Sequence, residues 1–252
     1  MLLALLGAIL IGLSLGLLGS GGSILTVPVL VYLLDQPEKV AIAGSLAIVG
    51  AIAAVGSLPY ARQQQVDWRS VLWFGLPGML GTWLGALASQ FVSGAMQLGL
   101  FAIVMLLAAV LMARPPRLEP QQAPARAAWK IVIDGLAVGL LTGLVGVGGG
   151  FLIVPALVLM GGLTMRVAVG TSLVIIALKS ATGLIGYLQL LSAAALDWTL
   201  LGLFIALGVA GSLAGNALAN RVPQRALRRI FAVFLVVMAA VILWRTLPAM
   251  FS

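Results

Sequence analysis

Long apolar runs recur along the whole chain and are separated by short polar loops. Each is about as long as a helix that spans, or half spans, a bilayer. In the first half they cover residues 2–18, 24–34, 40–59, 70–89 and 94–112, and in the second half residues 131–145, 151–161, 167–190, 198–218 and 229–246. Backbone groups in lipid must be paired within the segment, which favours helices. The pattern predicts an all-α integral membrane protein with about five helical segments per half.

The second half of the chain repeats the first. Gly19-Ser-Gly-Gly-Ser-Ile-Leu-Thr-Val-Pro28 returns 127 residues later as Gly146-Val-Gly-Gly-Gly-Phe-Leu-Ile-Val-Pro155, and Asp67-Trp68 returns 130 residues later as Asp197-Trp198. A duplicated membrane chain with a glycine break at the same place in each half is typical of secondary transporters. We expect a first membrane repeat over residues 1–113, a cytoplasmic linker over 114–129 and a second membrane repeat over 130–252.

The number of segments per half decides the symmetry. Five is odd, so the second repeat would be inverted relative to the first, and eleven of the fourteen Lys and Arg residues would face one side. Four segments per half would make the repeats parallel, and the basic loop residues would then divide seven to six between the two sides of the membrane. Because basic loops stay in the cytoplasm, we predict two inverted repeats with both termini outside. Segments 24–34 and 151–161 would each rise only about 16 Å, so whether they cross or form broken, re-entrant hairpins is open.

Composition narrows the function classes. The chain is 62% hydrophobic and 8% charged, with a mean hydropathy of +1.20. It has no Cys and no His, which removes disulfides, the commonest metal ligands and the usual neutral-pH base, so we expect no catalytic residue, metal or cofactor. The net charge of +8 lies in loops between apolar spans and indicates membrane topology rather than nucleic-acid binding. Residues 1–18 lack a basic leader and predict a structural span.

The two glycine loops are the strongest candidate site. Each leads directly into a helix, whose unpaired N–H groups and dipole favour an anion. In an inverted repeat the two helix starts can converge on one midplane site. The alternative is that glycine only permits close helix crossing. Neither loop fits a Walker or Rossmann pattern. The candidate substrate-binding residues here are Gly19, Ser20, Gly21, Gly22, Ser23, Gly146, Gly148, Gly149 and Gly150.

Lys179 is the only charge well inside an apolar run, and its counterpart in the first half is Ile52. An ammonium in a bilayer is costly, so we expect it to pair with a substrate anion; a contact with backbone carbonyls is the alternative. The hydroxyls of Ser45, Thr171 and Ser172 are further candidates to bind an oxyanion. Interhelical hydrogen bonds would explain them equally well.

Other polar and small residues are explained without substrate. Tyr60 and Tyr187 are expected to anchor span ends at the membrane interface. Asp67 and Asp197 are expected to cap helices. Asp134, four residues after Lys130, is expected to form a local ion pair, with a proton relay as the alternative. The spaced glycines predict close helix contacts at Gly12/Gly16, Gly135/Gly139/Gly143, Gly81/Gly85 and Gly211/Gly215.

The paired Gly-x-Gly-Gly-Gly/Ser…Val-Pro-x-Leu elements, each followed by Ser-Leu, resemble the TauE/SafE family of sulfite exporters, also called the toluene-sulfonate uptake permease family. The run Val169-Gly-Thr-Ser-Leu-Val-Ile-Ile-Ala-Leu-Lys-Ser is especially similar, and the likeness covers the entire chain. The resemblance implies a multi-pass permease of the bacterial inner membrane for sulfur-containing anions such as sulfite or organosulfonates. The family is often drawn with eight spans, whereas the charges here favour ten segments.

The residues predict a secondary transporter of small anions, and the family resemblance implies an exporter of sulfur-containing ones. The anion would lie at the midplane between the glycine loops with Lys179 as its counter-charge, and the two halves would alternate around it. An anion channel of the same architecture is the alternative. An enzyme is disfavoured because no nucleophile–base pair is evident. The expected partners are the small anion and membrane lipid, with no nucleic acid; proton coupling and oligomeric state are open.

Overall fold

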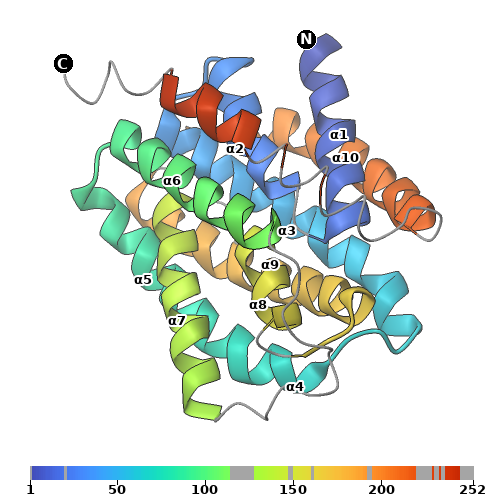
Figure 1. Ribbon diagram of the computed structural model, residues 1–252. Coiled ribbons are helices and arrows are strands. Elements are labelled where there is room, and N and C mark those ends of the chain that lie inside the picture. The colour runs from blue at the N-terminus through green and yellow to red at the C-terminus, as the bar shows by residue number, and fades with distance from the viewer. Residues whose placement is uncertain are drawn as a thin grey trace.

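The computed structural model describes residues 2–19, 22–113, 128–146, 150–159, 162–191, 195–219, 229, 233 and 236–244. Across these ranges the regular structure is helical, with no strand, which confirms the all-α fold (Figure 1). The elements are α1 (Leu2–Leu18), α2 (Gly22–Tyr32), α3 (Glu38–Arg62), α4 (Trp68–Ser70), the π-helix η1 (Val71–Gly75), α5 (Leu76–Ala88), the 3₁₀ turn η2 (Ser89–Phe91), α6 (Gly94–Ala113), α7 (Ala128–Val145), α8 (Gly150–Leu159), α9 (Met165–Leu190) and α10 (Trp198–Ala219).

Among the residues that the structure describes, four helical stretches are long and apolar enough to cross a membrane. They are Glu38–Arg62, Trp68–Phe91, Met165–Leu190 and Trp198–Leu218. Shorter apolar helices cover Ala4–Leu17, Gly22–Tyr32 and Gly94–Leu107. The eleven residues of α2 rise about 16 Å, roughly half of a hydrocarbon core. The chain is therefore a multi-pass membrane protein that also contains short helices of the predicted kind.

Helices α3 and α9 cross at the centre of the molecule, and each repeat supplies one of them. Gly50 of α3 faces Ser180 of α9, where a Cβ would lie 3.0 Å from the Ser180 Cβ. Gly56 faces Leu173, and Gly183 faces Leu46, so the two helices run antiparallel.

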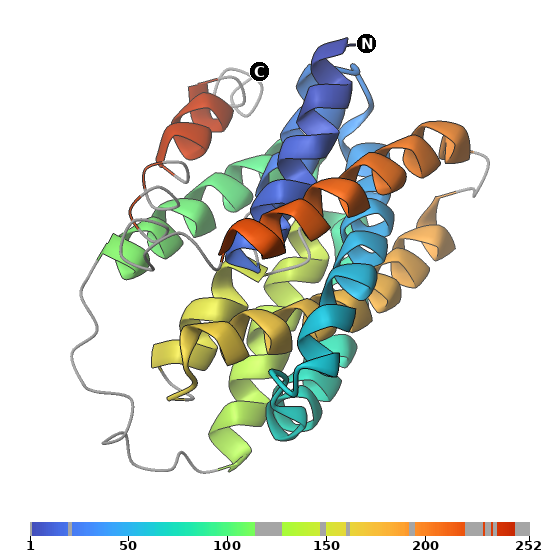
Figure 2. The ribbon, with the colours of Figure 1, turned by 90° about the vertical axis from the view of Figure 1, so that its right-hand side faces the viewer.

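The outer helices pair across the two halves. Helix α1 packs along α10, and α7 packs along α5, as Figure 2 shows for the first pair. A methyl group on Gly12 would overlap the backbone of Gly208, and one on Gly139 would overlap the backbone of Gly78. These positions are equivalent in the repeat, so the same close crossing occurs twice. The predicted role of the spaced glycines in helix contacts is confirmed.

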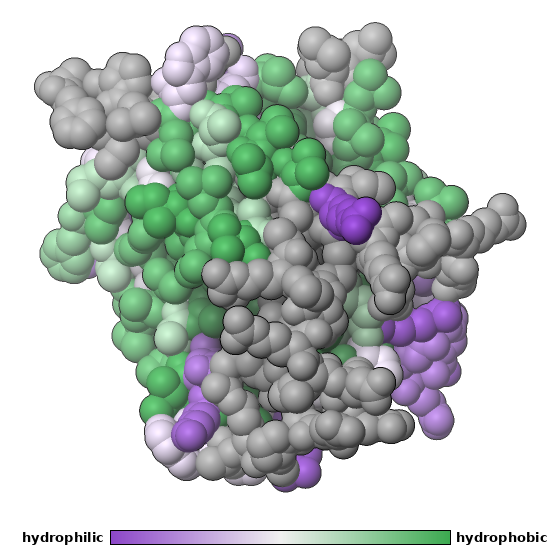
Figure 3. All heavy atoms as spheres, viewed as in Figure 1, coloured by the Kyte–Doolittle hydropathy of each residue, from purple (hydrophilic) through white to green (hydrophobic). Residues whose placement is uncertain are grey.

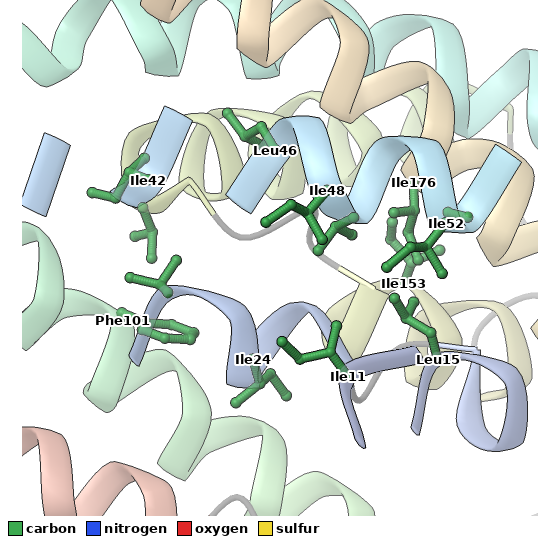
Figure 4. Close-up of a cluster of buried hydrophobic side chains, with 14 of the residues drawn as sticks. Ile11, Leu15, Ile24, Ile42, Leu46, Ile48, Ile52, Phe101, Ile153 and Ile176 are labelled. Carbon is green, nitrogen blue, oxygen red and sulfur yellow. The ribbon is translucent and has the colours of Figure 1, made fainter. Parts of the chain in front are cut away.

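The buried core joins the central pair to the short helices. Figure 4 shows Ile48 and Ile52 of α3 beside Ile176 of α9, with Leu15 of α1 and Ile153 of α8 close by. Large apolar side chains also face outward, as a lipid environment requires, including Leu80, Ile103, Leu107 and Ile185. In Figure 3, hydrophobic residues cover the upper and left part of the face in view, and hydrophilic residues lie mainly at its lower and right edges.

Helix ends follow the local sequence. The carboxylate of Asp67 accepts a hydrogen bond from the N–H of Ser70, and that of Asp197 accepts from the N–H of Leu200, so both predicted caps are confirmed. Helix α2 ends at Tyr32, two residues earlier than expected, because Asp35 takes a left-handed φ of 49° and Pro37 precedes α3. The linker predicted over residues 114–129 lies largely outside the described residues, so the division into 1–113 and 130–252 stays a prediction.

Candidate functional site

Equivalent serines link each half to the glycine loop of the other. The Ser45 hydroxyl of α3 lies 2.5 Å from the carbonyl oxygen of Gly146, and the Ser172 hydroxyl of α9 lies 3.1 Å from that of Gly19. Each serine also lies 2.8 Å from a carbonyl one turn back on its own helix. Both side chains are buried. The interhelical explanation of these hydroxyls therefore describes their contacts, and their binding of an anion stays a prediction.

Both loops begin at a glycine with positive φ. Gly19 has φ +68° and Gly146 has φ +71°, a region that a side chain disfavours. Each N–H still donates the last helical hydrogen bond of its helix, over 2.8 Å. Space is restricted as well, because a Cβ on Gly19 would lie 2.8 Å from Val169 Cγ1 and one on Gly146 would overlap Ile42. Glycine is required here by both backbone angle and packing.

The two glycine carbonyls contact the central helices α3 and α9 at different heights along the α3 axis. The Gly146 carbonyl lies at Ser45 of α3. The Gly19 carbonyl lies at Ser172 of α9, whose neighbour Leu173 faces Gly56 of α3. Eleven residues separate Ser45 from Gly56, so the two levels lie about 16 Å apart along α3. A single small oxyanion cannot contact both of these glycines at once.

The remaining loop residues are less informative. Gly22, Ser23 and Gly150 are buried at the starts of α2 and α8. A Cβ on Gly22 would overlap the carbonyl oxygen of Ile11, so this glycine permits the close return of α2 along α1. The candidate positions Ser20, Gly21, Gly148 and Gly149 lie outside the described residues.

Two tyrosines lie inside the protein rather than at its lipid surface. Tyr60 is 3% exposed and Tyr187 is 1% exposed, so the expectation that they anchor the membrane interface is wrong. Their hydroxyls donate to carbonyls in the last turns of α1 and α7, Tyr60 to Gly16 over 3.4 Å and Tyr187 to Leu144 over 3.1 Å. The tyrosines satisfy helix-end carbonyls beside the glycine loops.

Gln97 is a buried polar residue that the sequence reasoning missed. Its Nε2 donates to the carbonyl of Leu144 over 2.9 Å and lies 3.4 Å from the Tyr187 hydroxyl. A glutamine inside the apolar run 94–112 was the available signal.

Thr171 has a different role from its neighbour Ser172, because its hydroxyl accepts a hydrogen bond from the N–H of Asp67 over 2.9 Å.

Lys179 lies near the middle of α9, fourteen residues after Met165 and eleven before Leu190. Its side chain has no exposed surface, and its Nζ has no hydrogen-bond partner among the described residues. The ammonium lies 5.8 Å from the centre of the Phe74 ring, within the range of a cation–π contact. A Cβ on Gly78 would lie 3.2 Å from Lys179 Cδ, so α5 has room for the aliphatic stem because residue 78 is glycine.

The surroundings of Lys179 differ from those of the equivalent position in the first half, Ile52. Its counterpart Ile52 is also fully buried, and a Cβ on Gly208 would overlap this isoleucine. Phe74 lies in the π-helix η1, just before Pro77, whereas the equivalent part of α10 is α-helical and has Leu207 in place of the proline. Local π-helix in an α-helical span is frequent at functional sites. The buried charge of Lys179 and the π-helix η1 therefore occur together, whereas the equivalent position at Ile52 and α10 has neither.

Acidic residues offer no metal site in this part of the molecule. Among the described residues, no three of the acidic side chains lie close enough together to hold a metal ion.

Comparisons with known proteins agree with this membrane architecture. The family model "Sulfite exporter TauE/SafE" matches residues 4–242. A "Probable membrane transporter protein" of Xylella fastidiosa is 34% identical over 244 residues, covering 94% of this chain and 92% of that protein. One from Methanocaldococcus jannaschii is 30% identical over 190 residues, covering 71% of each chain. One from Bacillus subtilis, YdhB, is 26% identical over 239 residues, covering 93% and 96%. No solved structure matches the chain.

Proposed function

Because this chain belongs to the TauE/SafE sulfite exporter family of membrane transporters, we propose that it exports small sulfur-containing anions, such as sulfite or organosulfonates, as a secondary transporter. The observation that carries the proposal is Lys179, a fully buried side chain whose Nζ has no hydrogen-bond partner in the part of the chain that the structure describes. A buried ammonium without a partner is strongly unfavourable, so a ligand that supplies a negative charge would relieve it. The Phe74 ring, 5.8 Å from the Nζ, offers only a cation–π contact.

Alternating access is supported by how the halves contact each other. Both glycine loops are held by serines of the opposite half, and both outer helices pack on the opposite half. A movement of one repeat against the other would change these contacts together. The glycine loops would then shape the path of the anion, with Lys179 between their two levels. Direct contact of the loops with the anion stays a prediction.

The inverted arrangement of the repeats and a bacterial inner-membrane location belong to the proposal. Arg62 and Arg69 lie where α3 ends and α4 begins, and Arg166 at the start of α9 donates to Gln65 over 3.1 Å. Glu38 lies at the opposite end of α3. The loop-charge rule favours the arginine end in the cytoplasm. Both termini would then be outside.

Flux of labelled sulfite into proteoliposomes tests the function. We expect uptake that saturates with sulfite concentration and that is accelerated by unlabelled sulfite on the opposite side, because a carrier returns faster when loaded. Protein-free vesicles are the control. Flux that rises without saturation and shows no such exchange would indicate the channel alternative, and no flux above the control would contradict the proposal.

A further inference from the structure

The elements that pack on α9 around Lys179 contribute little charge. Helices η1, α5 and α8 contain no charged residue. In α3 the charges are Glu38, Lys39 and Arg62, all at its ends. Helix α7 carries Lys130 near its start and the half-buried Asp134 just before Gly135, whose carbonyl faces Gly78. The Nζ of Lys179 has no hydrogen bond to the Asp134 carboxylate. Lys179 is the only charged residue that is buried among those whose burial the structure describes.

The charge of a ligand enters its binding energy in two ways. Its attraction to one ammonium grows in proportion to the ligand charge, so a dianion gains about twice as much as a monoanion. The cost of removing it from water grows with the square of the charge, so a dianion loses about four times as much. With a single buried cation as partner, the second negative charge is therefore unfavourable.

The described helices that pack around Lys179 place no second positive charge beside it. The first-half position equivalent to Lys179 is Ile52. A helix start contributes about half a charge. Ser172, which marks the level of the Gly19 loop, lies seven residues before Lys179, about 10 Å along the helix. The Gly146 loop is held by Ser45, which lies next to Leu46, and Leu46 faces Gly183 of α9. The two loops therefore lie on opposite sides of Lys179 along α9, so only one helix start can lie beside an anion at Lys179.

We infer that the Lys179 site selects anions that carry one negative charge. The inference rests on the proposed function and defines the charge of its substrate. For sulfite, the bound species is the singly protonated hydrogensulfite ion, and for organosulfonates it is a sulfonate without a second acidic group. A doubly charged anion of the same size is rejected because its dehydration is not offset.

Methanesulfonate and methylphosphonate test the inference because they share size and tetrahedral shape. Methanesulfonate stays a monoanion, whereas methylphosphonate gains a second charge between mildly acidic and mildly alkaline pH. The half-saturating concentration of each is measured from the shift in melting temperature of the purified full-length protein, since a ligand stabilises the folded state it binds. Their ratio is the readout, so that any change of the protein itself with pH cancels.

We expect the ratio of the methylphosphonate to the methanesulfonate concentration to rise by about tenfold or more from the acidic to the alkaline pH. Lys179→Met should abolish both shifts, and Ile52→Met should retain them. A ratio that stays constant or falls would overturn the charge selectivity but leave sulfite transport intact. The proposed function fails separately, by absence of sulfite flux.

Discussion

At the scale of single residues, the hydroxyls of Ser45 and Ser172 make contacts between helices, although the sequence also makes them candidates to bind the substrate. Ser45 and Ser172 were reasonable candidates to donate to an oxyanion. In the structure each lies within hydrogen-bond distance of a glycine carbonyl of the opposite half. A serine hydroxyl has a single hydrogen, so donating it to a carbonyl leaves none for an anion. These contacts favour the interhelical explanation, and binding of an anion by either hydroxyl stays a prediction.

Ser45→Ala and Ser172→Ala should therefore lower stability more than they weaken ligand binding. Each loses an interhelical hydrogen bond, worth about 1 kcal/mol. Ser57→Ala is the matched control, because the Ser57 hydroxyl donates to Ala54 within its own helix. Thermal unfolding and sulfite affinity are measured together. Affinity reduced tenfold or more at unchanged stability would show instead that these hydroxyls bind the substrate.

Residue-level prediction succeeded where one segment carries the signal. The burial of Lys179 follows from its place in a long apolar run, and the capping by Asp67 and Asp197 follows from the start of the next run. The contacts of Phe74, Gln97 and Tyr187 depend on segments far apart in the sequence. No local pattern places a tyrosine under a helix end rather than at the lipid interface.

At the scale of helices, the apolar runs predicted the segments because a chain in lipid has few alternatives to a helix. The boundaries moved by a few residues where turn residues intervene, as at Asp35 and Pro37. The π-helix Val71–Gly75 was not predicted; it lies just before Pro77, and the backbone of Phe74 packs against Gly135 of α7, a contact between distant segments.

The two outer crossings should respond alike to added volume. Gly12→Ala would place a methyl group in the backbone of Gly208, and Gly139→Ala would do the same at Gly78. The helices would have to separate, so we expect each variant to lose about 1–3 kcal/mol of stability. Gly202→Ala in α10 is the control, since a Cβ there meets nothing within 4 Å. Equal melting temperatures for all three variants in detergent would contradict the close crossings.

At the scale of the whole molecule, the orientation of the two ends can be tested directly, because the chain contains no cysteine. Gln63 is exposed after α3 at the arginine-rich end, and Gln90 is exposed after α5 at the other end. In intact cells, an impermeant thiol reagent should label Gln90→Cys at once and Gln63→Cys only after permeabilisation. The reverse pattern would overturn the proposed orientation.

The membrane potential should drive export if one monovalent anion crosses without a coupled ion. An inside-negative potential favours its exit by about 2.3 kcal/mol per 100 mV. Efflux of labelled sulfite from proteoliposomes should therefore accelerate when a potassium diffusion potential makes the interior negative. An efflux rate that does not change with the potential but changes with a pH gradient would indicate electroneutral coupling to protons.

The proposed transport depends on the Lys179 ammonium as the counter-charge of the transported anion. It is tested most directly by sulfite flux through Lys179→Met beside Ile52→Met, the equivalent position in the other half. Both variants place an unbranched methionine in a buried site, and only the first removes a charge. We expect flux reduced to the protein-free background in Lys179→Met and retained in Ile52→Met. Wild-type flux in a folded Lys179→Met protein would contradict it.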